Sequence, residues 1–155
     1  CRICAEDPGR DFMPETGVVQ YLDVPDERWL RFESALDRGQ RVTTDFDSML
    51  AKLVVYGSDR QQAADRSVSA LKSLTLLGVT TNIDYLARVL DHGSFRAGDL
   101  HTGFVREHAA ALEPTPLHAD RRAQVLAAAA FGFHEFRELV FGTPEPHAAI
   151  GKWRN

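Results

Sequence analysis

The sequence lacks a long apolar run, a strong net charge and a recognisable signal peptide, and each absence excludes a class of protein. The longest apolar run, residues 125–133, is far shorter than the roughly 20 residues that a membrane-spanning helix needs. A net charge of −4, with both signs spread along the chain, argues against nucleic-acid binding, which needs a clustered basic face. We therefore expect a cytoplasmic protein with no membrane and no nucleic-acid partner.

Cysteine is also scarce, and Cys1 and Cys4 are the only two. Their C-x-x-C spacing is found in redox and zinc sites. If the segment is a strand, however, its first and fourth residues point to opposite faces, which hinders a shared metal. No second cysteine pair and no histidine pair at ligand spacing lies nearby in the sequence. We expect two reduced cysteines and no metal site.

The composition is otherwise that of an ordinary globular protein, with 44% apolar and 26% charged residues. A chain of 155 residues is long enough for one domain with a proper core and a short additional segment. Because the sequence starts at Cys1 without an initiator methionine, we expect it to begin inside a larger protein.

The most regular apolar pattern is the predicted strand 50–56, which Gly57 ends. Its residues alternate between an almost wholly apolar face and a face with a single lysine, Lys52. Such a strand belongs inside a sheet that another layer covers. Further strands are predicted over 1–5, 18–24 and 29–34, and an antiparallel meander is the simplest way to join them.

Helix signals follow the strands. Ser58 and Gln61 form a predicted capping box for a helix that runs to about residue 76, and Gly78 is placed to close it in a left-handed conformation.

Two further capping signals continue the helical half of the sequence. A second predicted capping box, Thr81 with Asp84, opens another helix, and a third helix is predicted from about 102 to 114. A long alanine-rich helix is predicted over about 117–141, after the Thr115-Pro116 helix start.

Several segments carry recognisable motifs in a fixed order. They are residues 1–8 (CRICAEDP), 12–17 (FMPETG), 30–34 (LRFES), 46–57 (FDSMLAKLVVYG), 78–82 (GVTTN) and 95–104 (FRAGDLHTGF). Together they resemble the C-terminal domain of biotin carboxylases, the biotin-carboxylating components of acyl-CoA carboxylases, over about residues 1–108. The tail weakly resembles the segment of fused α subunits that leads to the next domain.

The resemblance implies an α+β fold, an antiparallel β-sheet flanked by helices, over residues 1–113. Residues 114–155 are then expected to form a helical linker and the start of a following domain. The implied enzyme is an ATP-dependent ligase of the ATP-grasp type, which acts in pathways such as fatty acid metabolism. It forms carboxyphosphate from ATP and bicarbonate, and the released CO2 is captured by N1 of biotin.

The same resemblance names cofactors and partners. Biotin, ATP and Mg²⁺ are expected for the full enzyme, but none of them is expected to bind this chain alone, because the sequence has no glycine-rich phosphate loop and no paired metal-binding glutamates. The implied partners are the ATP-grasp part of the same enzyme, a biotin carboxyl carrier domain and a carboxyltransferase subunit. The carboxyltransferase subunit would select the acyl-CoA.

Arg2 is the candidate catalytic residue. The predicted strand holds its guanidinium rigidly, and the resemblance assigns it to binding biotin and bicarbonate and to stabilising negative charge on the ureido oxygen. Arginine suits this task because its charge does not titrate away and its fork can hold an oxyanion by two bonds. The alternative is a surface charge, or a structural ion pair with Glu6 or Asp7.

Two further residues match family positions with other roles. Arg31 matches an arginine at the homodimer interface of free-standing bacterial biotin carboxylases, but its aromatic companion is replaced here by Arg28. Two close arginines at an interface would repel each other unless they paired with carboxylates, for example Glu33 or Asp26. The alternative for Arg31 is a solvated charge on a strand. Asp47 matches an interface residue too, with a turn-capping aspartate as its alternative.

Two rival functions remain open from the sequence. The chain could be a non-catalytic module that shapes an oligomer interface, in which case Arg2 would lie in an ion pair or on open surface. It could also belong to another ATP-grasp ligase, such as a carbamoyl-phosphate or purine-pathway enzyme, which would not be expected to match six motifs in order.

Overall fold

The computed structural model describes residues 1–114 and Leu126, and residues 1–114 form one compact unit. The predicted helix over 117–141 and the predicted linker over 114–155 lie outside the described residues, apart from positions 114 and 126. No described helix is both long and apolar enough to cross a membrane.

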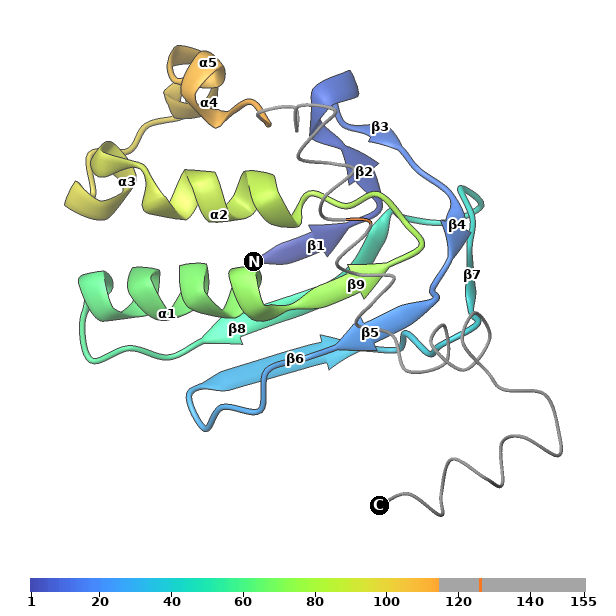
Figure 1. Cartoon of the computed structure of the whole chain (residues 1–155). Coiled ribbons are helices and arrows are strands. Elements are labelled where there is room, and N and C mark those ends of the chain that lie inside the picture. Colours follow the sequence, from blue (N-terminus) through green and yellow to red (C-terminus); the bar gives the residue numbers. More distant parts are fainter. Residues whose placement is uncertain (115–125, 127–155) are drawn as a thin grey trace, which may run out of the picture. The chain divides into compact units, whose positions relative to one another are not determined.

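Short strands dominate the first half of the unit, and helices the second half (Figure 1). The strands are β1 (Arg2–Cys4), β2 (Glu6–Asp7), β3 (Met13–Pro14), β4 (Gly17–Val18), β5 (Tyr21–Asp23), β6 (Leu30–Ser34), β7 (Arg41–Val42), β8 (Met49–Val55) and β9 (Thr75–Leu77). The helices are a 3₁₀ turn (Pro8–Arg10), α1 (Arg60–Ser73), α2 (Ile83–Asp91), α3 (Gly93–Ala97), α4 (Phe104–Glu107) and α5 (Ala109–Leu112).

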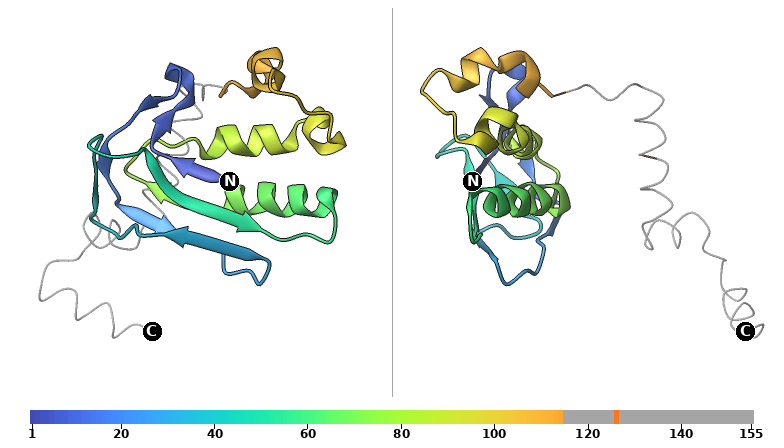
Figure 2. Two further views of the ribbon diagram at one scale, coloured as in Figure 1. Left: turned by 180° about the vertical axis from the view of Figure 1, so that it is seen from behind. Right: turned by 90° about the vertical axis from the view of Figure 1, so that its left-hand side faces the viewer.

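All described strand pairs are antiparallel, and helices cover one side of the main sheet (Figure 2). The main sheet has the order β1-β8-β6, and β2–β3, β4–β7 and β5–β9 form separate two-stranded pairs. The α+β fold with an antiparallel sheet flanked by helices is therefore confirmed.

The predicted meander is wrong, because the predicted strands 1–5, 18–24 and 29–34 do not pair with one another. The chain's first strand, β1, pairs with β8, and β5 pairs with β9, although several other strands lie between the partners of each pair in the sequence. The predicted strand 18–24 is also divided into β4 and β5. Val19 lies between them, fully buried, and its N–H donates to the carbonyl of Gln40.

The central strand behaves as its alternation predicts. Ala51 and Leu53 of β8 are buried on the face that meets the helices, while Lys52 on the other face is exposed. Ile3 of β1 joins them, and Leu71 of α1 and Leu74, the residue directly after α1, belong to the same core cluster.

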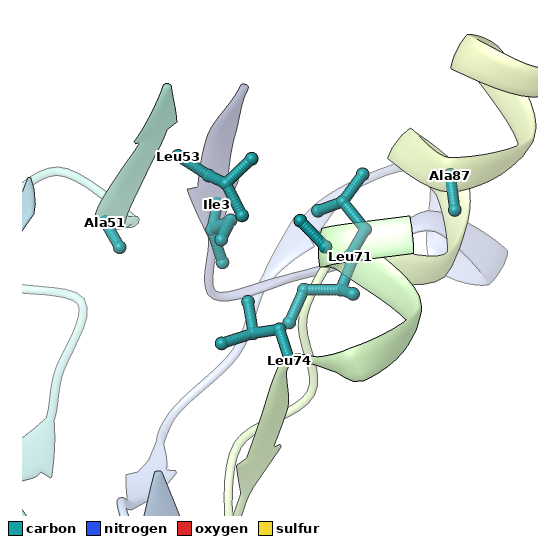
Figure 3. Close-up of a cluster of buried hydrophobic side chains, with 8 residues drawn as sticks. Ile3, Ala51, Leu53, Leu71, Leu74 and Ala87 are labelled. Carbon is teal, nitrogen blue, oxygen red and sulfur yellow. The ribbon is translucent and has the colours of Figure 1, made fainter. Parts of the chain in front are cut away.

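Figure 3 shows these side chains, together with Ala87 of α2, pointing toward one another from the sheet and from the two helices. Burial of a side chain the size of leucine or isoleucine contributes about 1.5–3 kcal/mol, so this cluster holds α1 and α2 on the sheet.

The first helix is shorter than predicted, and its cap is shifted by one residue. Asp59, not Ser58, accepts the capping bond, from the backbone N–H of Gln62, and the Gln62 side chain accepts from the Ser58 N–H. The helix ends at Ser73 because Leu74 is extended and residues 75–77 pair with β5 as strand β9. Tertiary pairing thus overrides the helical pattern at this end.

Three other boundary predictions also need correction. Thr81 and Asp84 form no capping box, because the N-cap residue of α2 is Asn82, whose side chain makes no capping bond. Gly78 does adopt a positive φ of 103°, but it follows β9 and not a helix. The predicted helix over 102–114 is two short helices, α4 and α5, which meet at His108.

Candidate functional site

The candidate site is built on β1, an edge strand of the main sheet. Arg2 lies directly opposite Lys52 of β8, and Ile3 lies opposite Ala51. The side chain of Ile3 is buried in the core, so the pleat turns Arg2 and Cys4 to the opposite, outer face. The strand therefore presents the Arg2 guanidinium away from the helices.

The other edge of β1 is bound by one residue, Asn82. Its side-chain oxygen accepts from the Cys4 N–H at 2.9 Å, and its side-chain nitrogen donates to the Arg2 carbonyl at 3.2 Å. The backbone N–H of Asn82 also donates to the Cys4 carbonyl at 3.2 Å. These are backbone groups that β1 turns away from β8, so neither edge of the strand is left unpaired there.

Charged side chains lie next to one another on the outer face of the three strands of the main sheet. Lys52 lies opposite both Arg2 and Glu33, and its ammonium donates to Glu33 at 2.8 Å. Arg31, two residues before Glu33 on β6, reaches the same carboxylate at 3.0 Å. We call Arg2, Lys52, Glu33 and Arg31 the outer-face charges. Two of the three cations, Lys52 and Arg31, pair with the one carboxylate, so the group carries a net positive charge and attracts anions.

The electrostatics of Glu33 reflect this arrangement. The hydrogen bond from Lys52, then the positive charges of Lys52 and Arg31, lower the pKa of the Glu33 carboxyl below its ordinary value. Glu33 is thus ionised and committed to two cations at neutral pH.

The Arg2 guanidinium itself is uncommitted within the described part of the chain. Arg2 is exposed, and its side chain forms no hydrogen bond or ion pair with any described residue. The two carboxylates offered as structural partners are used elsewhere: Glu6 accepts from the Ser48 hydroxyl at 2.6 Å, and Asp7 accepts from the Gly9 N–H at 2.9 Å. An ion pair of Arg2 with either of them is therefore not formed.

The other two candidate residues each have partners of their own. Arg31 is 70% exposed and pairs with Glu33, which is the carboxylate expected to offset its charge. Asp47 accepts from the Met49 N–H at 2.9 Å, two residues on, as a turn-capping aspartate does. The interface roles of Arg31 and Asp47 stay predictions.

The two cysteines are free thiols, Cys1 exposed and Cys4 half-buried. Burial, reinforced by the charge of Glu6, raises the pKa of the Cys4 thiol and keeps it protonated and unreactive. Among residues 1–114, no cluster of three or more histidine, cysteine or acidic residues could hold a metal ion. A magnesium ion would need ligands from elsewhere.

Two surface hollows also lie outside this site. One, of about 360 Å³, is lined by residues 16–18 and 41–45, and the other, of about 420 Å³, lies between the start of α1, Leu90 and Phe95. Neither contains Arg2. Because Arg2 itself is exposed, the candidate site is an open strand face, and an enclosed pocket there would need a second surface.

Comparison with known protein families assigns the chain to a family. Residues 1–107 match the family described as the biotin carboxylase C-terminal domain. The chain belongs to this family. The resemblance deduced from the six motifs is therefore confirmed.

Two relatives, one from a mammal and one from a bacterium, show the degree of similarity. The α subunit of methylcrotonoyl-CoA carboxylase, mitochondrial, of Rattus norvegicus is 38% identical over 132 residues, which cover 84% of this chain and 18% of the relative. The biotin carboxylase of Halalkalibacterium halodurans is 39% identical over 107 residues, covering 69% of this chain and 24% of that protein.

A solved structure shows the same fold in a larger protein. The biotin carboxylase domain of the Hydrogenobacter thermophilus 2-oxoglutarate carboxylase, crystallised as a dimer with MgADP, ADP and bicarbonate, superposes with a TM-score of 0.72 at 34% identity. The match covers 75% of this chain and 26% of that one. The chain thus spans between 18% and 26% of the length of these relatives.

The sequence pattern predicts Arg2 on a strand but gives no sign of the residues around it. The sequence shows Lys52 only as a lysine on a predicted strand, because its position opposite Arg2 depends on the pairing of β1 with β8. Asn82 appears in the sequence only as part of a motif. A polar residue directly before the apolar start of a helix usually predicts a side-chain capping bond, but Asn82 makes no such bond to α2.

Proposed function

We propose that this chain is the C-terminal part of the biotin carboxylase component of an acyl-CoA carboxylase. In the complete enzyme it assists the ATP- and bicarbonate-dependent carboxylation of biotin held on a carrier domain. Family membership and the 38% identity to a methylcrotonoyl-CoA carboxylase α subunit over 132 residues support this proposal. A separate carboxyltransferase subunit would select the acyl-CoA.

One observation carries the catalytic part of the proposal: Arg2 offers an exposed, unpaired guanidinium from a strand fixed at both edges. Bound biotin supplies the ureido nitrogen that takes up the carboxyl group, with negative charge developing on the ureido oxygen. A preorganised cation beside that oxygen lowers the barrier, most strongly where water is excluded. The guanidinium can also hold bicarbonate through two parallel hydrogen bonds.

The remaining parts of the active site are proposed to come from the ATP-grasp part of the same enzyme. That part would bind ATP and Mg²⁺, since residues 1–114 contain no cluster of metal ligands. It would also cover the outer face near Arg2 and exclude water. On this account, the isolated chain neither binds ATP nor turns over, and the site is completed between two parts of one protein.

The test is the steady-state turnover of the complete carboxylase carrying Arg2→Gln. We expect the biotin-dependent release of ADP to fall by about 10²–10³-fold, the usual cost of one oxyanion-stabilising donor. Thermal unfolding should be unchanged, because the side chain has no partner among the described residues.

Arg38→Gln is the matched control, since Arg38 is also an exposed arginine but lies in the turn after β6. Its turnover should equal that of the wild type. If both variants turn over normally, the chain is better described as a non-catalytic interaction module.

A further inference from the structure

Asn82 is the only buried polar or charged residue in the described part of the chain, with 7% of its surface exposed. It stands at the N-cap of α2, where an asparagine side chain normally accepts from the helix's own backbone. Here the side chain makes no such bond. Its amide is directed instead at β1, the strand that carries Arg2.

The amide of Asn82 acts on β1 as a neighbouring strand would. Its oxygen receives the N–H of Cys4 and its nitrogen donates to the carbonyl of Arg2, so one side chain binds the backbone on both sides of Ile3. With β8 paired to the opposite edge, the backbone of β1 is held from two directions at the catalytic arginine.

No other side chain fits these two bonds equally well. Aspartate keeps the acceptor for Cys4 but loses the donor, and its charge would face the carbonyl oxygen of Arg2. Serine is shorter, and alanine leaves the partly buried N–H of Cys4 and C=O of Arg2 without these side-chain partners. The pair of bonds therefore requires a carboxamide at this length.

We propose that Asn82 is a positioning residue for Arg2, an inference that rests on the proposed function. By fixing the backbone of β1, the carboxamide fixes the point from which the Arg2 side chain extends. A displacement of about 1 Å at a reacting centre can cost on the order of 100-fold in rate, so this support governs turnover and not only folding.

The experiment is a double-mutant cycle in the complete carboxylase. Asn82→Asp, Asn82→Ser and Asn82→Ala are each combined with the natural Arg2 and with Arg2→Gln, and kcat and KM for biotin are measured. With Arg2 present, we expect each Asn82 variant to lower kcat by roughly 10–100-fold. In the Arg2→Gln background, the same substitutions should lower kcat no further.

Asp59→Ala is the matched control for a loss of stability. Asp59 is the N-cap of α1 and makes a true capping bond to Gln62, so its removal weakens a helix start without touching β1. We expect this variant to unfold at a lower temperature with an unchanged kcat. Exchange of the Cys4 amide hydrogen should be at least about 10-fold faster in Asn82→Ala and Asn82→Ser, because the side-chain acceptor of its hydrogen bond is removed or shortened.

The outcomes separate the two proposals. If Arg2→Gln alone leaves turnover unchanged, the proposed function fails. If Arg2→Gln lowers turnover but the Asn82 variants leave kcat unchanged, or lower it equally in both backgrounds, only the positioning role fails. If every Asn82 variant unfolds, the residue serves stability alone and the positioning role is likewise overturned.

Discussion

Arg2 is held in place by neighbours that lie far from it in the sequence. Lys52 lies opposite Arg2 on the neighbouring strand. The Asn82 side chain binds the backbone of β1, accepting from Cys4, 78 positions earlier, and donating to Arg2, 80 positions earlier. The face on which Arg2 lies could be predicted, because alternation along a strand is local. Its supports could not, because nothing in the local pattern shows that residues 52 and 82 converge on residue 2.

The pairing of Lys52 with Glu33 gives a test of the outer-face charges. Replacing Lys52 with Met removes the strongest influence on Glu33, so the pKa of the Glu33 carboxyl should rise toward its ordinary value. The folded carboxyl has a depressed pKa, so its contribution to stability is present at neutral pH. That contribution is lost as the pH falls through the lowered pKa.

A carboxyl-detected NMR titration of this chain measures the shift directly. Lys72→Met is the control, since Lys72 lies near the end of α1 and has no part in the pair. An unchanged Glu33 titration in Lys52→Met would mean that the ion pair does not form in solution.

At the scale of elements, the structure departs from the sequence pattern mainly where distant strands meet. The turn after β9 illustrates this, because Gly78 has a positive φ and touches the chain between β4 and β5. The sequence predicted the unusual backbone of Gly78 correctly. It assigned that backbone to a helix end, because the pairing of residues 75–77 with β5 has no local signature.

Substitution of Gly78 should therefore be unusually costly. A Cβ at Gly78 would collide with the carbonyl oxygen of Val18, whereas a Cβ at Gly39, which also has a positive φ, would meet nothing within 4 Å. Gly39→Ala should lower the free energy of unfolding by about 1–2 kcal/mol, the cost of the backbone conformation alone. Gly78→Ala should lower it by about 1–3 kcal/mol more, because the chain must also move apart.

Urea unfolding of the two variants side by side measures this difference. Equal losses of stability would show that the close approach of the two segments is absent in solution.

At the scale of the whole unit, the fold extends beyond the family match. The match ends at residue 107, but Leu112 of α5 is among the most deeply buried side chains, with 1% exposed. It lies on a helix that contacts α2. The last two short helices therefore complete the core, although the sequence suggested one continuous helix there.

This burial predicts a measurable cost at a position outside the family match. Leu112→Ala should lower the free energy of unfolding by about 2–5 kcal/mol, as for other fully buried leucines. Leu100→Ala, at a leucine that is 42% exposed, should change the free energy of unfolding by less than about 0.5 kcal/mol. If both changes prove equally small in urea unfolding, residues 109–112 do not belong to the folded unit.

The fold class, the core face of β8 and the family were all accessible from the sequence, because alternation and local motifs carry them. The sheet order and the two-sided support of β1 were not, because they arise from contacts between the first strand and segments 50 to 80 residues later. The catalytic proposal depends on those contacts, since they fix the backbone from which the Arg2 guanidinium extends.

The most direct measurement is a single-turnover transfer of labelled carbon from bicarbonate to biotin by the complete enzyme. The account predicts that Arg2→Gln slows the appearance of carboxylated biotin by about 10²–10³-fold while Arg38→Gln leaves it unchanged. Transfer by a correctly folded Arg2→Gln enzyme at the wild-type rate would contradict it.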